Sequence, residues 1–127
     1  MEEIRDVVDI GVTPDGEETL KLLTEEKGWF NQQQAAARFA LALALKEKPE
    51  FKPLKNARTK WAARNIASEE DGLVDAVKIV YPDIQTPYKL LEFLIDRGLS
   101  IIQEENDHDP HISLEQILDD FVETDQQ

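Results

Sequence analysis

The longest apolar stretch of the chain predicts a buried helix at its centre. Every residue from Phe39 to Leu45 is apolar, so a helix there has no face made for water. Alanine and leucine are strong helix formers, and no β-branched residue interrupts them, which favours a helix over a strand. Asn31 is a good N-cap, with Gln34 as its capping-box partner. We therefore expect a helix over 31–48 against which most other elements pack.

The N-terminal segment shows the alternation of a short, half-buried strand. Val8, Ile10 and Val12 are separated by Asp9 and Gly11, which is the period-2 pattern of a strand with one face toward the core. A frayed arm over residues 1–12 is the alternative.

A helix follows this segment directly. Thr13 caps it with Pro14 at the first helical position, or else Asp15 caps it with Glu18 as its partner. Gly28 is a natural end for this helix.

Two helices are expected between residues 56 and 82. Asn56 is a candidate cap for a helix over 58–65, and Ser68 with Asp71 is a candidate capping pair for the next one. Pro82 ends that second helix. Its apolar face consists of Leu73, Val74, Val77 and Val80.

The last third of the chain predicts one long helix and one short helix. Thr86 and Pro87 open the long helix, and we expect it to continue through Gly98 at a cost of about 1 kcal/mol relative to alanine. Ser113 and Gln116 form a capping box for the short helix. The apolar positions of the short helix are Leu114, Ile117, Leu118 and Phe121.

Together these elements predict a mainly α fold in a single domain, 1–127. Five to six helices pack around the central helix 31–48, with one short N-terminal strand, and residues 123–127 form a frayed tail. A chain of 127 residues suits one domain with one core. Trp29 and Phe30 beside the apolar helix predict an exposed patch through which two copies form a homodimer.

Composition narrows the setting of the protein. The chain has no cysteine, which excludes disulfides and thiolate metal sites and favours a reducing cytoplasm. Its start, Met1-Glu2-Glu3, is acidic where a signal peptide needs basic residues. Its longest apolar run is far shorter than the roughly 20 residues of a membrane span. We expect a cytoplasmic protein without membrane contact.

The charge is distributed unevenly along the sequence. The net charge is −13, from 27 acids and 14 bases. Seven of the bases and only two of the acids fall within residues 46–64, so this window carries +5 and the rest of the chain carries −18. A negative field repels phosphate backbones at long range and favours basic partners.

This basic window is the strongest candidate for an interaction site. Bases interleaved with an aromatic residue bind phosphates while the ring stacks on a nucleic-acid base, or they contact an acidic protein. The alternative is that the window neutralises the acidic parts of the chain, within one copy or across a dimer, and that the tryptophan belongs to the core. The candidate binding residues are Lys52, Lys55, Arg58, Lys60, Trp61 and Arg64.

No catalytic or cofactor signature stands out. The five glycines stand singly, so no phosphate-binding loop is present, and we expect a protein that is not an enzyme and holds no cofactor. His108, Asp109 and His111 have side chains that suit zinc, nickel or manganese. A lone turn seldom presents three donors to one ion, so a solvated polar turn is the preferred interpretation and no metal is expected.

The segment from Val7 to Lys46, a strand followed by two helices, resembles a ribbon-helix-helix repressor. Such proteins dimerise by pairing their strands and read the major groove with them. The strand positions that would face DNA hold Asp9, Gly11 and Thr13, where the family uses basic or amide side chains. The resemblance implies a dimeric DNA-binding regulator, and the departure places its DNA reading in doubt.

A second resemblance covers more of the chain. An Arg-Phe-Ala helix follows an aromatic turn, a Lys-Trp pair comes next, and a Tyr-Pro-Asp break precedes a helix ending in Gly-Leu. The segments are Trp29 to Lys46, Thr59-Lys60-Trp61, Asp71-Gly72-Leu73 and Tyr81-Pro82-Asp83 through Pro87-Tyr88 to Gly98-Leu99. They resemble small accessory proteins encoded beside DNA phosphorothioation (Dnd) defence genes. The resemblance implies a non-catalytic component of a prokaryotic defence system and brings no active-site residues with it.

Two further interpretations stand beside an accessory or regulatory protein that acts through protein–protein contacts. One is the ribbon-helix-helix-like regulator. The other is an acidic inhibitor that occupies a nucleic-acid groove on another protein, with the carboxylates of residues 101–125 in place of phosphates.

Overall fold

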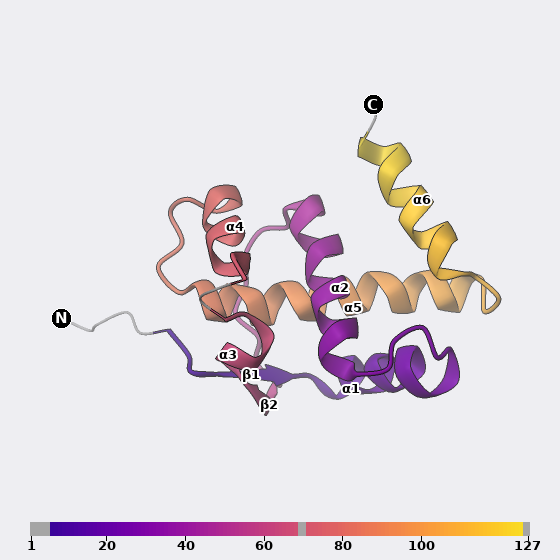
Figure 1. The fold of residues 1–127 in the computed structure, drawn as a ribbon, viewed down its shortest axis with the longest axis horizontal. Coiled ribbons are helices and arrows are strands. Elements are labelled where there is room, and N and C mark those ends of the chain that lie inside the picture. The colour runs from indigo at the N-terminus through magenta and orange to yellow at the C-terminus, as the bar shows by residue number, and fades with distance from the viewer. Residues whose placement is uncertain (1–5, 69–70, 126–127) are drawn as a thin grey trace.

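Helix α5 (Pro87–His108) spans the molecule, and the other elements are arranged about it (Figure 1). The computed structural model describes residues 6–68 and 71–125, without the side chains of residues 120–125. The remaining elements are β1 (Asp9–Val12), α1 (Pro14–Lys21), the π-helical turn η1 (Leu22–Glu26), α2 (Gln33–Glu47), β2 (Arg58–Ala62), α3 (Ala63–Ile66), α4 (Leu73–Val80) and α6 (Leu114–Asp125). The predicted mainly α fold with a short strand is confirmed.

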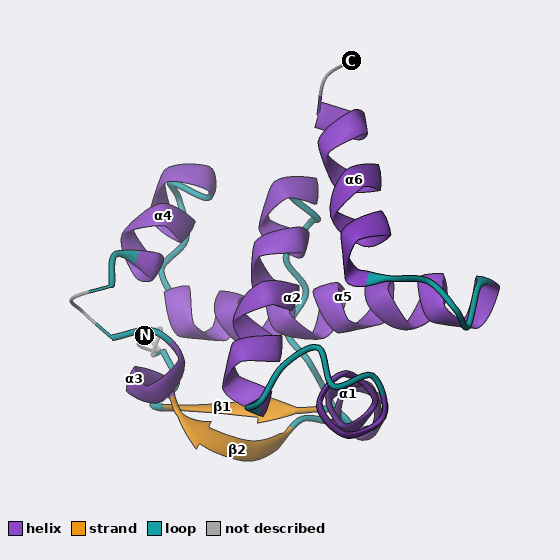
Figure 2. Ribbon diagram, turned by 45° about the vertical axis from the view of Figure 1, so that its right-hand side comes forward, coloured by secondary structure: helices purple, strands orange, loops and turns teal. Residues whose placement is uncertain are grey.

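The two sides of α5 carry different elements. Helices α4 and α6 rise from one side in both ribbon views, α1 and the β1–β2 ribbon lie on the other, and α2 crosses α5 and extends to both sides (Figures 1 and 2). Helix α5 contacts α1, α2, α4 and β1, and α2 contacts α1, η1, α3 and α5, so the two helices share the centre of the fold. The helix expected over 31–48 therefore lies at the centre together with α5, on which it mainly packs.

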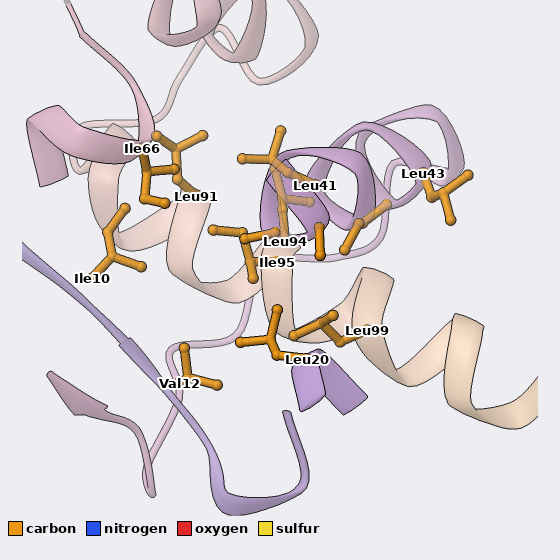
Figure 3. Packing of buried hydrophobic residues seen from close by; sticks show 14 of the residues in the cluster. Ile10, Val12, Leu20, Leu41, Leu43, Ile66, Leu91, Leu94, Ile95 and Leu99 are labelled. Atoms are coloured by element: carbon orange, nitrogen blue, oxygen red, sulfur yellow. The ribbon is translucent and has the colours of Figure 1, made fainter. Parts of the chain in front are cut away.

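The hydrophobic core forms where these elements meet. Figure 3 shows side chains from β1, α1, α2, α3 and α5 converging, among them Ile10, Leu20, Leu41, Ile66 and Leu94. All five are fully buried. Burying such side chains contributes about 1.5–3 kcal/mol each, so this cluster is the main stabilising element of the fold.

Helix α2 crosses α5 at a single close point. Gly98 of α5 lies so near Ala40 of α2 that an added Cβ would collide with the Ala40 carbonyl group and lie 2.8 Å from its Cα. Glycine therefore permits the crossing, and α5 continues through it as predicted. The propensity cost of the glycine is offset by the close packing of the two helices.

Two details of the α2 prediction are wrong. Helix α2 begins at Gln33, and its N-cap is Gln32 without a side-chain hydrogen bond, so Asn31 and Gln34 form no capping box. The helix is also not buried all round, because Ala42 is exposed on a solvent-facing stripe with Ala35, Arg38 and Lys46. Alanine is small enough to occupy either face of a helix, so an apolar run overstates burial where its members are alanines.

The aromatic pair before α2 belongs to the body of the protein. Trp29 and Phe30 are half-buried and pack against the core, and the Phe30 ring centroid lies 5.4 Å from that of Phe39. The prediction that these two residues form an exposed patch is therefore wrong, whereas the homodimer itself stays a prediction.

The predicted helix over 58–65 is wrong as well. Residues 58–62 form β2, which pairs antiparallel with β1, and only the single turn α3 follows. The register shifts between Ile10 and Gly11, so Lys60 stands as the extra residue of a β-bulge. A lone strand leaves its backbone groups unpaired, so the predicted N-terminal strand required a partner, and the Thr59–Trp61 segment suits that role.

The helix that follows starts later than predicted. Helix α4 begins at Leu73, and Asp71 accepts hydrogen bonds from the Leu73 N–H (2.9 Å) and the Ser68 N–H (3.0 Å). Ser68 is therefore not its cap. Residues 69–70 lie outside the described part of the chain.

Three other predicted helix ends are confirmed. The Thr13 hydroxyl accepts from the Gly16 N–H (3.1 Å), so Thr13 is the cap of α1. Ser113 and Gln116 exchange both bonds of a capping box, at 2.8 and 3.1 Å. Gly28, with φ +63°, follows the η1 turn as a left-handed stop. The frayed tail predicted over 123–127 is only partly described: α6 runs to Asp125, and residues 126–127 lie outside the described part.

The N-terminus of α5 is capped from a distance. Thr86 makes no side-chain cap; instead Asp6 accepts from the Tyr88 N–H (2.7 Å) and the Lys89 N–H (2.9 Å). A carboxylate at this position satisfies free N–H groups and suits the positive end of the helix dipole.

Replacement of Asp6 tests this long-range cap. Asp6→Ala removes both acceptors, and we expect it to lower the free energy of unfolding by about 1 kcal/mol in urea denaturation. Asp6→Asn keeps one acceptor and should lose less. Equal stability of all three proteins would show that the cap contributes nothing.

Candidate functional site

The basic segment, residues 46–64, lies across α5 and along the ribbon. Its loop, 48–57, packs the Phe51 ring against Phe93 of α5, with centroids 5.7 Å apart. The Tyr81 hydroxyl donates to the Pro49 carbonyl oxygen and so fixes the start of the loop. Burial, and secondly the Glu47 carboxylate, raises the pKa of the Tyr81 phenol above its ordinary value of 10.0. The phenol therefore remains a donor through the neutral pH range.

Two of the predicted binding residues are engaged within the chain. The Lys60 Nζ lies 2.8 Å from the Glu17 Oε1 of α1 and 5.5 Å from the centroid of the Trp61 ring. Trp61 itself is half-buried, lies opposite Ile10 in the ribbon and packs against the core. The interpretation in which the segment neutralises acids within one chain therefore holds for Lys60.

The other four predicted binding residues point outward. Lys52, Lys55, Arg58 and Arg64 are exposed. Among the residues that the structure describes, their side chains make no hydrogen bond or ion pair. A chain of 27 acids thus leaves these four cations unpaired on its described part.

A groove of about 650 Å³ lies between the first turns of α1 and the C-terminal half of α5, and Asn56 of the basic segment contributes to its lining. Its lining combines neutral hydrogen-bonding groups with carboxylates from both helices. The carboxylates are Asp15, Glu18, Asp96, Glu104 and Asp107. The lining, as far as the chain is described, holds no histidine, lysine or arginine, so the groove suits a cationic group.

Side-chain hydrogen bonds between the two helices position this groove. The Thr13 hydroxyl donates to Asp96 Oδ1 (2.7 Å), and the Thr19 hydroxyl lies 2.9 Å from Gln103 Oε1. One turn earlier on α5, Glu92 Oε2 accepts from the N–H of Gly11 (2.8 Å). The N-terminal unit is therefore held along α5 by polar contacts as well as by the core.

This groove was not predicted from the sequence, although a signal for it is present. Polar residues recur on α5 at steps of four, four, three and four, which places them on one helix face. The stripe consists of Glu92, Asp96, Ser100, Gln103 and Asp107. The partner residues on α1 had no comparable pattern.

The histidine-containing turn has an ordinary structural role. Asp109 Oδ1 accepts from the His111 N–H (3.1 Å), and Lys27 Nζ donates to the Pro110 carbonyl oxygen (2.7 Å). His108 and His111 are exposed. Across the described ranges, no group of three or more acidic or histidine side chains is placed to hold a metal ion.

The β1 strand is engaged on both of its edges. One edge pairs with β2 of the same chain, and on the other edge the Gly11 N–H donates to Glu92. A ribbon-helix-helix protein leaves this strand free for the strand of a second copy. The strand–helix–helix order is present here, but strand pairing takes place within one chain.

Comparison with known proteins assigns the chain to no family, so a functional assignment depends on the geometry of the site. The chain matches no protein-family model, no curated protein and no solved structure. None of the helices in the described residues has the length and apolar character needed to cross a bilayer.

Proposed function

We propose that the protein is a non-catalytic accessory or regulatory protein that acts through protein–protein contacts, with the basic segment as its contact surface. The observation that carries the proposal is the set of four exposed, unpaired cations on one segment of a strongly acidic chain. Bases that are buried or paired within the chain would stabilise the fold. Exposed bases without such a pair, on a fixed loop and ribbon, can instead bind the carboxylates of a partner.

The wider setting belongs to the same proposal. The resemblance to accessory proteins of DNA phosphorothioation systems supports a role in a prokaryotic defence system, in the cytoplasm. The large negative charge supports a protein partner over nucleic acid, because it repels phosphates at long range.

Charge reversal tests the contact surface. We expect Lys52→Glu/Arg58→Glu to bind the partner about tenfold more weakly than the unmodified protein, which corresponds to about 1.4 kcal/mol. The partner is isolated with the tagged protein from its native cells, and the affinities are then measured by titration calorimetry. Lys21→Glu/Lys78→Glu is the matched control, because it changes the net charge equally at exposed positions outside the segment. Equal affinity of the two variants would refute the proposal.

The acidic groove favours a second candidate, an inhibitor that mimics nucleic acid. The groove carboxylates and the acidic residues of α6 would then take the place of phosphates on a basic protein. The same titration separates the candidates: the second requires Glu104→Lys/Asp107→Lys to lose the partner while Lys52→Glu/Arg58→Glu keeps it. Competition by excess DNA would accompany that result.

A further inference from the structure

Helix α6 (Leu114–Asp125) is poorly supported by its own chain. It projects from the end of α5 in both ribbon views, and as far as the chain is described it makes few contacts with the other elements (Figures 1 and 2). Ile117 is buried, but Leu118 in the next position is 41% exposed. A helix of 12 residues is marginal in water without packing, so α6 is suited to dock on another surface.

The charge of α6 defines the chemistry of that surface. Glu115 and Asp119 are exposed, and neither makes an ion pair or hydrogen bond with any other described side chain. No lysine or arginine occurs from Ile101 to the end of the chain. A surface complementary to α6 is therefore basic around an apolar contact.

The chain itself carries such a surface. Lys52, Lys55 and Arg58 of the basic segment are exposed and unpaired within the described ranges, and Val8, which directly precedes β1, is 79% exposed. Within one molecule the ribbon, with Arg58, lies on the opposite side of α5 from α6, so α6 does not reach that part of the segment (Figure 2). Two copies related by a twofold axis can join them twice, as isologous interfaces do.

We infer that, when no other partner is bound, α6 of a second copy of the chain covers the basic segment. This inference rests on the proposed function, in which the basic segment is a contact surface. The partner of the proposed function then displaces α6. Until the partner displaces it, the acidic helix prevents polyanions from binding non-specifically to the basic segment.

Site-specific cross-linking tests the arrangement directly. The chain has no cysteine, so one cysteine can be placed at Asp119→Cys in one copy and at Thr59→Cys in a second copy of different mass. Both positions are exposed, and Thr59 leaves every base in place. We expect a short bis-maleimide to join the two copies much more efficiently than it joins Thr59→Cys to the matched control Lys78→Cys in α4. Sedimentation equilibrium of the unmodified protein should show a dimer that Lys52→Glu/Arg58→Glu weakens about tenfold.

Each outcome decides the inference. A monomer throughout the accessible concentration range overturns it, and so does cross-linking that is equally efficient from Lys78→Cys. The proposed function is judged separately by partner titration. A monomeric protein whose charge-reversed variant loses its partner keeps the proposed function and removes only this inference.

Discussion

Gly98→Ala should destabilise the protein by about 3 kcal/mol and lower its melting temperature by about 10 °C. The added methyl group has no free volume, because it would meet the backbone of Ala40 at the crossing of α2 and α5. A flexible side chain could turn away, but a backbone carbonyl moves only if the whole of α2 moves. The measurement is urea and thermal denaturation followed by circular dichroism.

The sign of this result is informative because helix propensity acts in the opposite direction. In an open helix position, alanine is more favourable than glycine by about 1 kcal/mol. Ser100→Ala is the control, since Ser100 is exposed in the same helix and its change should stay within about 0.5 kcal/mol. If Gly98→Ala proved as stable as the unmodified protein, the close crossing of the two helices would be wrong.

The fold class was predictable because it depends on local pattern. The cap at Thr13, which is one of the two predicted for this helix, and the predicted capping box of Ser113 and Gln116 are contacts within four residues, and both appear in the structure. The cap of α5 was not predictable in this way, because Asp6 reaches it from 82 residues away. Local signals define where helices begin only when the capping group is local.

The position of α5 at the centre of the fold could not be predicted from hydrophobicity. The apolar run of α2 indicated burial, yet the alanines at 35 and 42 face solvent. Helix α5 shares the centre with α2, and its mixed composition provides a different contact for each neighbour: Gly98 for α2, Glu92 for β1 and Asp96 for α1. A helix that contacts many elements needs a different side chain toward each one, so hydrophobicity alone does not identify it.

The candidate site was predictable in part. Charge counting located the basic segment, but only the structure distinguishes Lys60, paired with Glu17, from unpaired Arg58. The two residues lie on one strand, and their difference arises from the position of α1. Pairing across the fold decides which charges remain free for a partner.

Glu92→Ala should lower the free energy of unfolding by about 2 kcal/mol. The Gly11 N–H is buried in the ribbon and donates to the Glu92 carboxylate at 2.8 Å. Removing the acceptor leaves a buried donor unsatisfied, which costs about 1–3 kcal/mol. Urea denaturation measures the loss, and amide hydrogen exchange at Gly11 should become faster in the same variant.

Glu92→Gln separates the hydrogen bond from the charge. Its amide oxygen can still accept from Gly11, so we expect a loss below about 1 kcal/mol, while Glu104→Ala, an exposed carboxylate on the same helix, should have almost no effect. If the glutamine variant lost as much as the alanine variant, the negative charge and not the acceptor would hold β1 on α5. Glu92 lies one turn before Asp96 on the same polar stripe of α5. In that outcome, a cation approaching the groove would also interact with the Glu92 charge and so change the stability of the contact between the ribbon and α5.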